Sequence, residues 1–131
     1  MPIKTSSAKA KGRRLQQRVR DCILAAFPKL HSDDVRSTSL GASGENILLS
    51  KAARDVFPYL VECKSLAKVS VYKHLDQAIT NCLVGAEPLV VIKADRRSPI
   101  VIIDAEYFFS IIRRLKKCLN LDLSLIISGS F

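Results

Sequence analysis

The chain has 131 residues, of which 48% are apolar, and 21 basic against 12 acidic side chains give it a formal charge of +9. This length and apolar content predict one folded domain with a single core and exclude a disordered chain. No apolar run reaches the roughly 18 residues that span a bilayer, and none has the pattern of a signal peptide. We therefore expect a cytoplasmic protein without membrane association, and the charge predicts a polyanionic partner.

The basic charge is concentrated at the amino-terminal end. Residues 1–20 contain seven Lys and Arg and no acidic residue, so they supply +7 of the +9. Residues 1–12 also contain Ser, Ala and Gly, which predicts a flexible basic arm. Apolar residues then recur at helical spacing from Leu15 to Phe27 and predict a helix over 13–27 that Pro28 ends.

Apolar periodicity predicts alternating helices and strands in the rest of the chain. Extended segments are expected at 35–39, 47–49, 59–64, 89–93 and 100–103, and further helices at 51–57, 70–83 and 105–119. Ser50 and Asp104 are placed to cap two of these helices. The order predicts an α/β domain over 13–119, with a mixed sheet and helices on its faces. The apolar tail 120–131 predicts either an edge strand or a dimer contact.

The four cysteines do not form a metal-binding pattern. Cys22, Cys63, Cys82 and Cys118 contain no CxxC pair and no neighbouring histidine cluster. A zinc site is therefore not expected, and the cysteines are interpreted as small core residues in a reducing compartment.

The sharpest motif is Glu62-Cys63-Lys64 on the expected strand 59–64. Because strand side chains alternate, Glu62 and Lys64 share one face while Val61 and Cys63 share the other. A carboxylate beside an ammonium group can bind a divalent metal and orient a water near a phosphate. An E-x-K triplet is also common as a solvated ion pair, so its meaning depends on the motifs around it.

Four other short motifs accompany this strand. Gly12-Arg13-Arg14 opens the first helix, Arg36-Ser37-Thr38-Ser39 and Gly44-Glu45-Asn46-Ile47 precede the strand, and Gln77 lies on the following helix. In this order they resemble archaeal-type Holliday junction resolvases and small phage nucleases of the PD-(D/E)XK superfamily. The resemblance covers roughly residues 12 to 115. It implies a restriction-endonuclease-like fold, with a mixed central sheet flanked by helices.

The resemblance also implies an activity and a catalytic set. Glu62 and residue 46 would hold Mg²⁺, or alternatively Mn²⁺, with the Cys63 backbone carbonyl as a further ligand. Lys64 would stabilise charge or orient the water, and Gln77 would support the site. The implied function is a structure-specific DNA endonuclease that cuts branched or junction DNA. The implied state is a homodimer, acting in the bacterial host cytoplasm if the protein comes from a phage.

Two positions depart from the family pattern. The chain has Asn46 where the family has a metal-binding Asp, and Gln16 where many resolvases have an acid in the first helix. An amide lacks the negative charge that holds Mg²⁺. Glu45 is expected to face away from residue 46, and Asp55 is an alternative ligand. Three functions therefore stay open: a nuclease with weak or lost cleavage, a non-cleaving DNA-binding protein on the same fold, and a basic protein that binds RNA or another anion.

Basic and hydroxyl residues around these motifs predict phosphate contacts, which position a duplex without reading its sequence. The expected DNA-binding residues are Lys9, Lys11, Arg13, Arg14, Arg36, Ser37, Ser39, Lys68 and Lys73. His74 could contact phosphates as well, and a solvated helix face is the alternative for both Lys73 and His74. Arg96 and Arg97 are interpreted as a polar hairpin turn. Few aromatic residues accompany the charges, which argues against a single-strand stacking platform.

Overall fold

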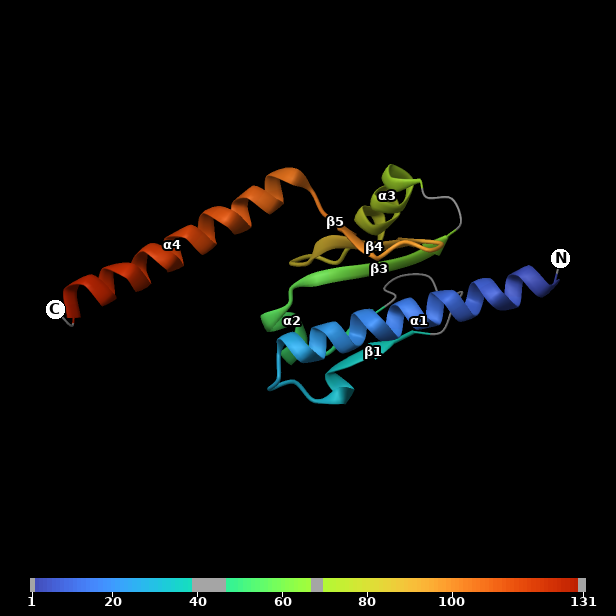
Figure 1. The fold of residues 1–131 in the computed structure, drawn as a ribbon, viewed down its shortest axis with the longest axis horizontal. Coiled ribbons are helices and arrows are strands. Elements are labelled where there is room, and N and C mark those ends of the chain that lie inside the picture. Colours follow the sequence, from blue (N-terminus) through green and yellow to red (C-terminus); the bar gives the residue numbers. More distant parts are fainter. Residues whose placement is uncertain (1, 39–46, 67–69, 130–131) are drawn as a thin grey trace.

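The computed structural model describes residues 2–38, 47–66 and 70–129, with backbone only at 2–6, 66 and 121–129. Its elements in chain order are α1 (Pro2–Ala26), η1 (Ser32–Asp34), β1 (Val35–Ser37), β2 (Ile47–Leu49), α2 (Lys51–Val56), β3 (Tyr59–Leu66), α3 (Val71–Asn81), β4 (Glu87–Ala94), β5 (Ile100–Ile102) and α4 (Ala105–Gly129). Figure 1 shows α1 and α3 on opposite sides of the sheet formed by β3, β4 and β5.

The larger sheet is mixed, as the sequence predicts. β3 and β4 are parallel and joined through α3, and β5 pairs with β4 antiparallel, in the order β3-β4-β5. β1 and β2 form a separate two-stranded antiparallel sheet. Parallel strands need a crossover connection such as α3, which packs on one face of the sheet. The α/β class and the mixed sheet are therefore confirmed.

Each face of the larger sheet has its own apolar cluster. On the α1 face, the buried residues are Leu15, Ile23, Val35, Ile47, Leu49, Ala53, Val61, Cys63 and Val91. On the α3 face, they are Ala78, Val90 and Ile92. The alternation along β3 and β4 sends odd-numbered residues toward α1 and even-numbered residues toward α3. This alternation sets the surroundings of the E-x-K motif.

The amino-terminal segment differs from the expected arm. α1 begins at Pro2 rather than at residue 13, so residues 2–12 are helical. Ala, Lys and Arg have favourable helix propensities, and extending a helix that core packing has already nucleated is far easier than starting one. Pro2 is tolerated because the first helical turn needs no backbone N–H there. The basic segment is therefore a continuation of the helix.

The carboxyl-terminal tail also differs from one expectation. α4 continues through the apolar residues to Gly129, so the alternative of an edge strand is wrong. The chain from 105 to 128 contains neither Gly nor Pro, and Leu is a strong helix former, so nothing ends the helix earlier. In Figure 1, α4 extends away from the sheet. The dimer contact stays a prediction.

Ser50 connects α2 to the turn before β1. Its hydroxyl donates to Asp34 Oδ1 at 2.7 Å and accepts from the Ala53 N–H at 3.1 Å, which makes it the N-cap of α2. The His31 N–H donates to the second Asp34 oxygen at 2.8 Å. The Ser50 hydroxyl, and after it the His31 N–H, hold the pKa of Asp34 below its ordinary value. Charged Asp34 therefore stabilises the folded state at neutral pH.

We predict that Ser50→Ala lowers the free energy of unfolding by about 1 kcal/mol, because it removes the cap of α2. Because the pKa of Asp34 is lowered in the folded state, its interactions stabilise the fold above the ordinary carboxyl pKa. This stabilisation is lost as the pH falls below about 4. The loss in free energy of unfolding caused by Ser50→Ala should therefore be smaller in acid. Urea unfolding at pH 7 and pH 3 measures both effects. Ser50→Thr keeps the hydroxyl and is the control; an equal loss in that variant would contradict the capping role.

Candidate functional site

β3 places the E-x-K motif on the face of the sheet that α3 covers. Glu62 is only 1% exposed, and its Oε1 lies 3.1 Å from Lys64 Nζ. The Lys64 side chain is 26% exposed, so the pair reaches the surface on the lysine side. Glu62 Oε2 is buried and has no hydrogen-bond partner among the described residues. A buried carboxylate oxygen without a partner costs free energy, which is typical of a group that binds a ligand.

α3 adds His74 to this pair. His74 is 8% exposed, and both ring nitrogens are buried without a hydrogen-bond partner in the described part of the chain. Burial, then the charges of Lys64 and Lys73, lower the pKa of His74, while the charge of Glu62 opposes this shift. These interactions place the imidazole within electrostatic reach of Glu62 and Lys64. At neutral pH it is uncharged and has a lone pair that can accept a proton or bind a metal.

His74 is the site residue that sequence reasoning placed wrongly. A solvated helix face or a phosphate contact was expected, and the structure buries the side chain instead. Its position one turn before Ala78 puts it on the buried stripe of α3. That spacing is a signal that could have identified it, because residues four apart share a helix face.

The role that the resemblance implies for Gln77 stays a prediction. The Gln77 side chain is exposed, and the buried side chains of α3 are His74 and Ala78. The structure therefore brings His74 to the E-x-K pair, and it leaves Gln77 outside the buried cluster. Three expected residues lie outside the described part of the chain: Ser39, Asn46 and Lys68.

Gln16, on α1, is a third buried polar residue. It is 2% exposed, and its Oε1 has no hydrogen-bond partner among the residues that the structure describes. Cys63 points to the same side of the sheet as α1, where burial raises the pKa of its thiol to about 12. The thiol is therefore protonated at neutral pH and unsuited to metal binding. The role that the resemblance implies belongs to the backbone carbonyl of Cys63 and not to this thiol.

The described residues supply a small set of metal donors. Among them, no three His, Cys, Asp or Glu side chains could together hold a metal ion. Glu62 Oε2 and a nitrogen of His74 are the unpartnered donors near the E-x-K pair. Mg²⁺ is commonly held by one or two carboxylates, with substrate phosphates and waters completing its shell. The described residues near the E-x-K pair therefore supply one carboxylate and one imidazole, and no complete set of metal ligands.

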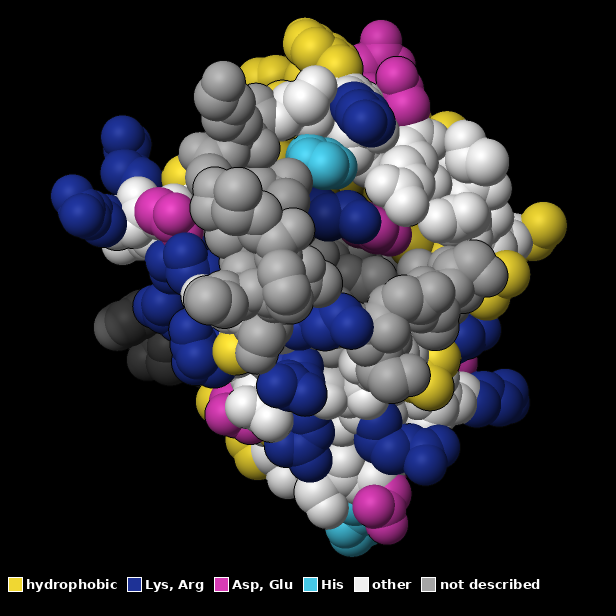
Figure 2. Space-filling model, turned by 90° about the vertical axis from the view of Figure 1, so that its right-hand side faces the viewer, with side chains coloured by type: hydrophobic (Ala, Val, Ile, Leu, Met, Phe, Trp, Pro, Cys, Tyr) yellow, Lys and Arg dark blue, Asp and Glu magenta, His cyan; other side chains and the backbone are white. Residues whose placement is uncertain are grey.

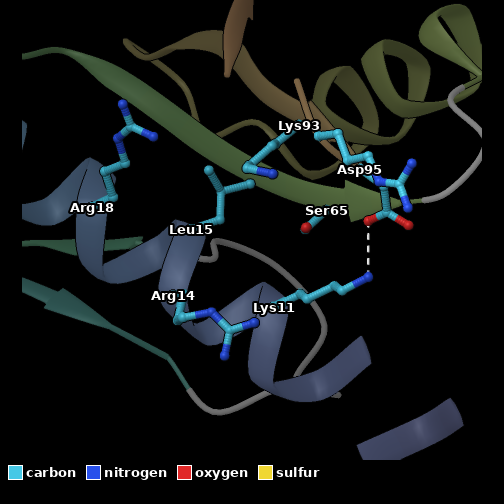
Figure 3. Close-up of a pocket in the computed structure, with 8 residues that line it drawn as sticks. Lys11, Arg14, Leu15, Arg18, Ser65, Lys93 and Asp95 are labelled. Carbon is cyan, nitrogen blue, oxygen red and sulfur yellow. Dashed lines mark hydrogen bonds and ion pairs between the residues drawn. The ribbon is translucent and has the colours of Figure 1, made fainter. Parts of the chain in front are cut away.

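A basic cleft of about 550 Å³ lies on the other side of β3, between α1 and the β4–β5 turn. It is lined by Lys11, Arg14, Leu15, Arg18, Ser65, Lys93, Asp95 and Arg96. Figure 3 shows Lys11, Arg14, Leu15 and Arg18 on α1, with Lys11 reaching Asp95 across the cleft. Lys11 Nζ lies 2.9 Å from Asp95 Oδ1, and this contact lowers the pKa of Asp95. Figure 2 shows Lys and Arg side chains gathered at this end of the molecule.

The expected DNA-binding residues that the structure describes lie partly in the basic cleft and partly elsewhere on the surface. Lys11 and Arg14 line the basic cleft. Exposed elsewhere on the surface are Lys9, Arg13, Arg36, Ser37 and Lys73. Sequence reasoning missed three cleft residues, namely Arg18, Lys93 and Arg96. The spacing of 11, 14 and 18 along one helix face is a signal for Arg18, whereas Lys93 and Arg96 reach the cleft only through the tertiary fold.

No family model, curated protein or solved structure matches this chain. Within the described residues, none of the helices combines the length and apolar character needed to cross a membrane. Function is therefore inferred from the E-x-K pair, His74 and the basic cleft.

Proposed function

We propose that this chain is a metal-dependent DNA endonuclease of the PD-(D/E)XK type, related to Holliday junction resolvases and sharing their restriction-endonuclease-like fold. One observation carries the proposal: Glu62 is buried beside Lys64 at 3.1 Å, with its second carboxylate oxygen lacking a partner among the described residues. An ion pair with a purely structural role gains no stability from a buried carboxylate oxygen that lacks a hydrogen-bond partner. A ligand-binding carboxylate explains it.

The chemistry is hydrolysis of a backbone phosphodiester. Water adds to phosphorus, one P–O bond breaks, and the leaving oxygen takes up a proton. Glu62, the Cys63 carbonyl and residue 46 would hold Mg²⁺ or Mn²⁺, and the bound ion lowers the pKa of water and neutralises phosphate charge. Lys64, whose amine is held by Glu62, donates to a phosphate oxygen. His74 offers an unpartnered nitrogen to accept the proton of the water.

Basic side chains outside the E-x-K site suit a nucleic-acid backbone. Cationic side chains of α1 and the β4–β5 turn line the basic cleft, and further ones are exposed on β1 and α3. Contacts of this kind bind phosphates with a strong dependence on salt and without sequence preference. They support a substrate recognised by its shape, such as branched DNA.

We further propose that the nuclease acts as a homodimer through α4. This helix extends from the sheet and exposes the large apolar side chains Phe108, Phe109, Ile112, Leu115 and Leu119. A contiguous apolar face of this size is unfavourable in water and is typical of a surface that packs against another molecule. A second copy would provide it symmetrically, and a two-fold dimer suits a junction that needs two cuts.

Two amide side chains, Gln16 and Asn46, favour a second function, which is DNA binding without cleavage. Gln16 is buried with an unpartnered oxygen, and it stands where many resolvases have an acid. Asn46 likewise lacks the charge of the family's Asp. Both amides are therefore consistent with a protein of the same fold that binds DNA without cleaving it.

Cleavage and gel-shift assays on a four-way junction, a linear duplex and an RNA hairpin test these functions. We expect the junction to be bound most tightly and to be cut only when Mg²⁺ or Mn²⁺ is added. Junction binding without any cleavage would favour the non-cleaving protein. Equal binding of RNA and both DNAs without cleavage would favour a general anion-binding protein and contradict the nuclease.

A further inference from the structure

The basic cleft lies on a different face of the sheet from the E-x-K pair. Ser65 and Lys93 are register partners on β3 and β4, and their odd numbers direct them toward α1. Glu62 and Lys64 are even-numbered and direct their side chains toward α3. An anion bound in the cleft is therefore separated by β3 from an anion bound at Glu62.

The charge of the cleft is strongly unbalanced. Among the described residues that line it, five side chains are cationic and one, Asp95, is a carboxylate, which already pairs with Lys11. Arg14, Arg18 and Arg96 form no ion pair with any described residue. Like charges gathered around one cleft repel each other, so an anionic ligand that neutralises them binds favourably.

The turn that closes the cleft has a strained residue at the cleft itself. Arg96 has a φ of +62°, in the left-handed region that favours glycine. The Arg97 N–H donates to the Ala94 carbonyl at 3.2 Å and closes the turn around it. Gly or Asn would fit this position with less strain. A strained arginine that lines a basic cleft points to a function of its side chain rather than of its backbone.

The lining also limits which ligand fits. The described lining residues include no aromatic side chain, and Leu15 is the one large apolar residue among them. Unpaired bases therefore find no platform for stacking, which single-strand binding requires. Guanidinium and ammonium groups recognise the phosphates, which a duplex presents on its outside.

We infer that the basic cleft binds a backbone phosphate of duplex DNA at a point away from the bond that is cut. The identity of the polymer rests on the proposed function. The site is a second contact, on the α1 face of the sheet, and it holds the DNA without entering the chemistry at Glu62.

Two substitutions from different elements test the cleft. Arg96→Gly removes the cleft arginine and relieves the strained turn, and its control Arg97→Gly removes a neighbouring charge that does not line the cleft. Arg18→Gln removes a cleft arginine from α1, and its control Arg113→Gln removes an exposed charge from α4. Melting temperature shows that each variant folds, and Arg96→Gly should not lower it.

Binding is measured with a linear duplex in EDTA at several salt concentrations, so that no cleavage occurs. Each cleft variant should weaken binding at least about fivefold near 0.1 M salt and reduce the log–log salt slope by about 1. Each control should change the dissociation constant less than about twofold. Cleft variants that bind like their controls would overturn the inference. A wild-type protein that binds no DNA would instead overturn the proposed function, so the two failures are distinguishable.

Discussion

Glu62→Gln should abolish metal-dependent cleavage, with a rate loss of at least about 10²-fold, while the protein still folds and binds DNA. Metal-assisted stabilisation of the scissile phosphate is worth several kcal/mol, and about 3 kcal/mol corresponds to this factor. In the wild type, Glu62 Oε1 lies 3.1 Å from Lys64 Nζ. The Gln amide keeps an oxygen near this ammonium group but has no negative charge to bind a metal ion. Cleavage of a labelled junction with Mg²⁺ or Mn²⁺ is the measurement.

The same variant separates a catalytic role from a structural one. Because the second carboxylate oxygen of Glu62 has no partner among the described residues, neutralising it should change the free energy of unfolding by less than about 1 kcal/mol. DNA binding without metal should be equal or tighter, since one negative charge near the phosphates is removed. A large loss of stability would indicate a structural ion pair.

Asp55→Asn is the matched control. Asp55 is the alternative ligand suggested by the sequence, and its side chain is exposed on α2. Its removal changes the net charge in the same way as Glu62→Gln, so cleavage should persist. A protein that loses cleavage with Asp55→Asn and keeps it with Glu62→Gln would show that the active site is elsewhere.

The features that sequence predicts well here are local. Apolar runs in β4 and β5 and the helical stripe of α3 are enough to predict a mixed α/β sheet, because period and length distinguish strands from helices. Alternation along β3 is enough to place Glu62 and Lys64 on one face and Cys63 on the other. These expectations agree with the structure because each depends on residues close together in the chain.

The features that sequence does not predict depend on tertiary contacts. His74 is buried because α3 packs with that side against the sheet, and its neighbours in sequence do not specify this. The basic cleft joins α1 to the β4–β5 turn, which are about 80 positions apart, and Lys11 meets Asp95 there. Charge patterning finds the basic segment of α1 but cannot tell which distant residues face it.

Helix ends follow a different rule. Pro28 and the apolar stripe predict the end of α1 within a few residues, but its start lies far before the first core residue. A helix nucleated by packing continues into any neighbouring segment of good propensity. α4 continues into the apolar tail for a different reason, because the chain from 105 to 128 contains neither Gly nor Pro. Where composition alone suggests an arm or a strand, an adjoining packed helix can decide the outcome.

Asn46→Asp should turn a weakly active or inactive protein into a clear Mg²⁺- or Mn²⁺-dependent nuclease on branched DNA, with a rate gain of at least about tenfold. Residue 46 lies outside the described residues, and its role rests on the resemblance to PD-(D/E)XK nucleases. There an Asp gives the ion a second carboxylate beside Glu62, and one more charged ligand tightens metal binding. The shapes of Asn and Asp are nearly equal, so packing should change little.

A readout independent of cleavage accompanies this prediction. Metal that binds only the folded state stabilises it by mass action, by about 2.7 kcal/mol at a concentration 100 times its dissociation constant. The melting temperature of Asn46→Asp should therefore rise with added Mn²⁺, and that of the wild type should rise less. The double variant Glu62→Gln/Asn46→Asp should lose both the cleavage and the metal-dependent rise. If Asn46→Asp shows neither effect, even together with Gln16→Glu, the proposed metal site is wrong and the non-cleaving DNA-binding function becomes the better explanation of the basic surface.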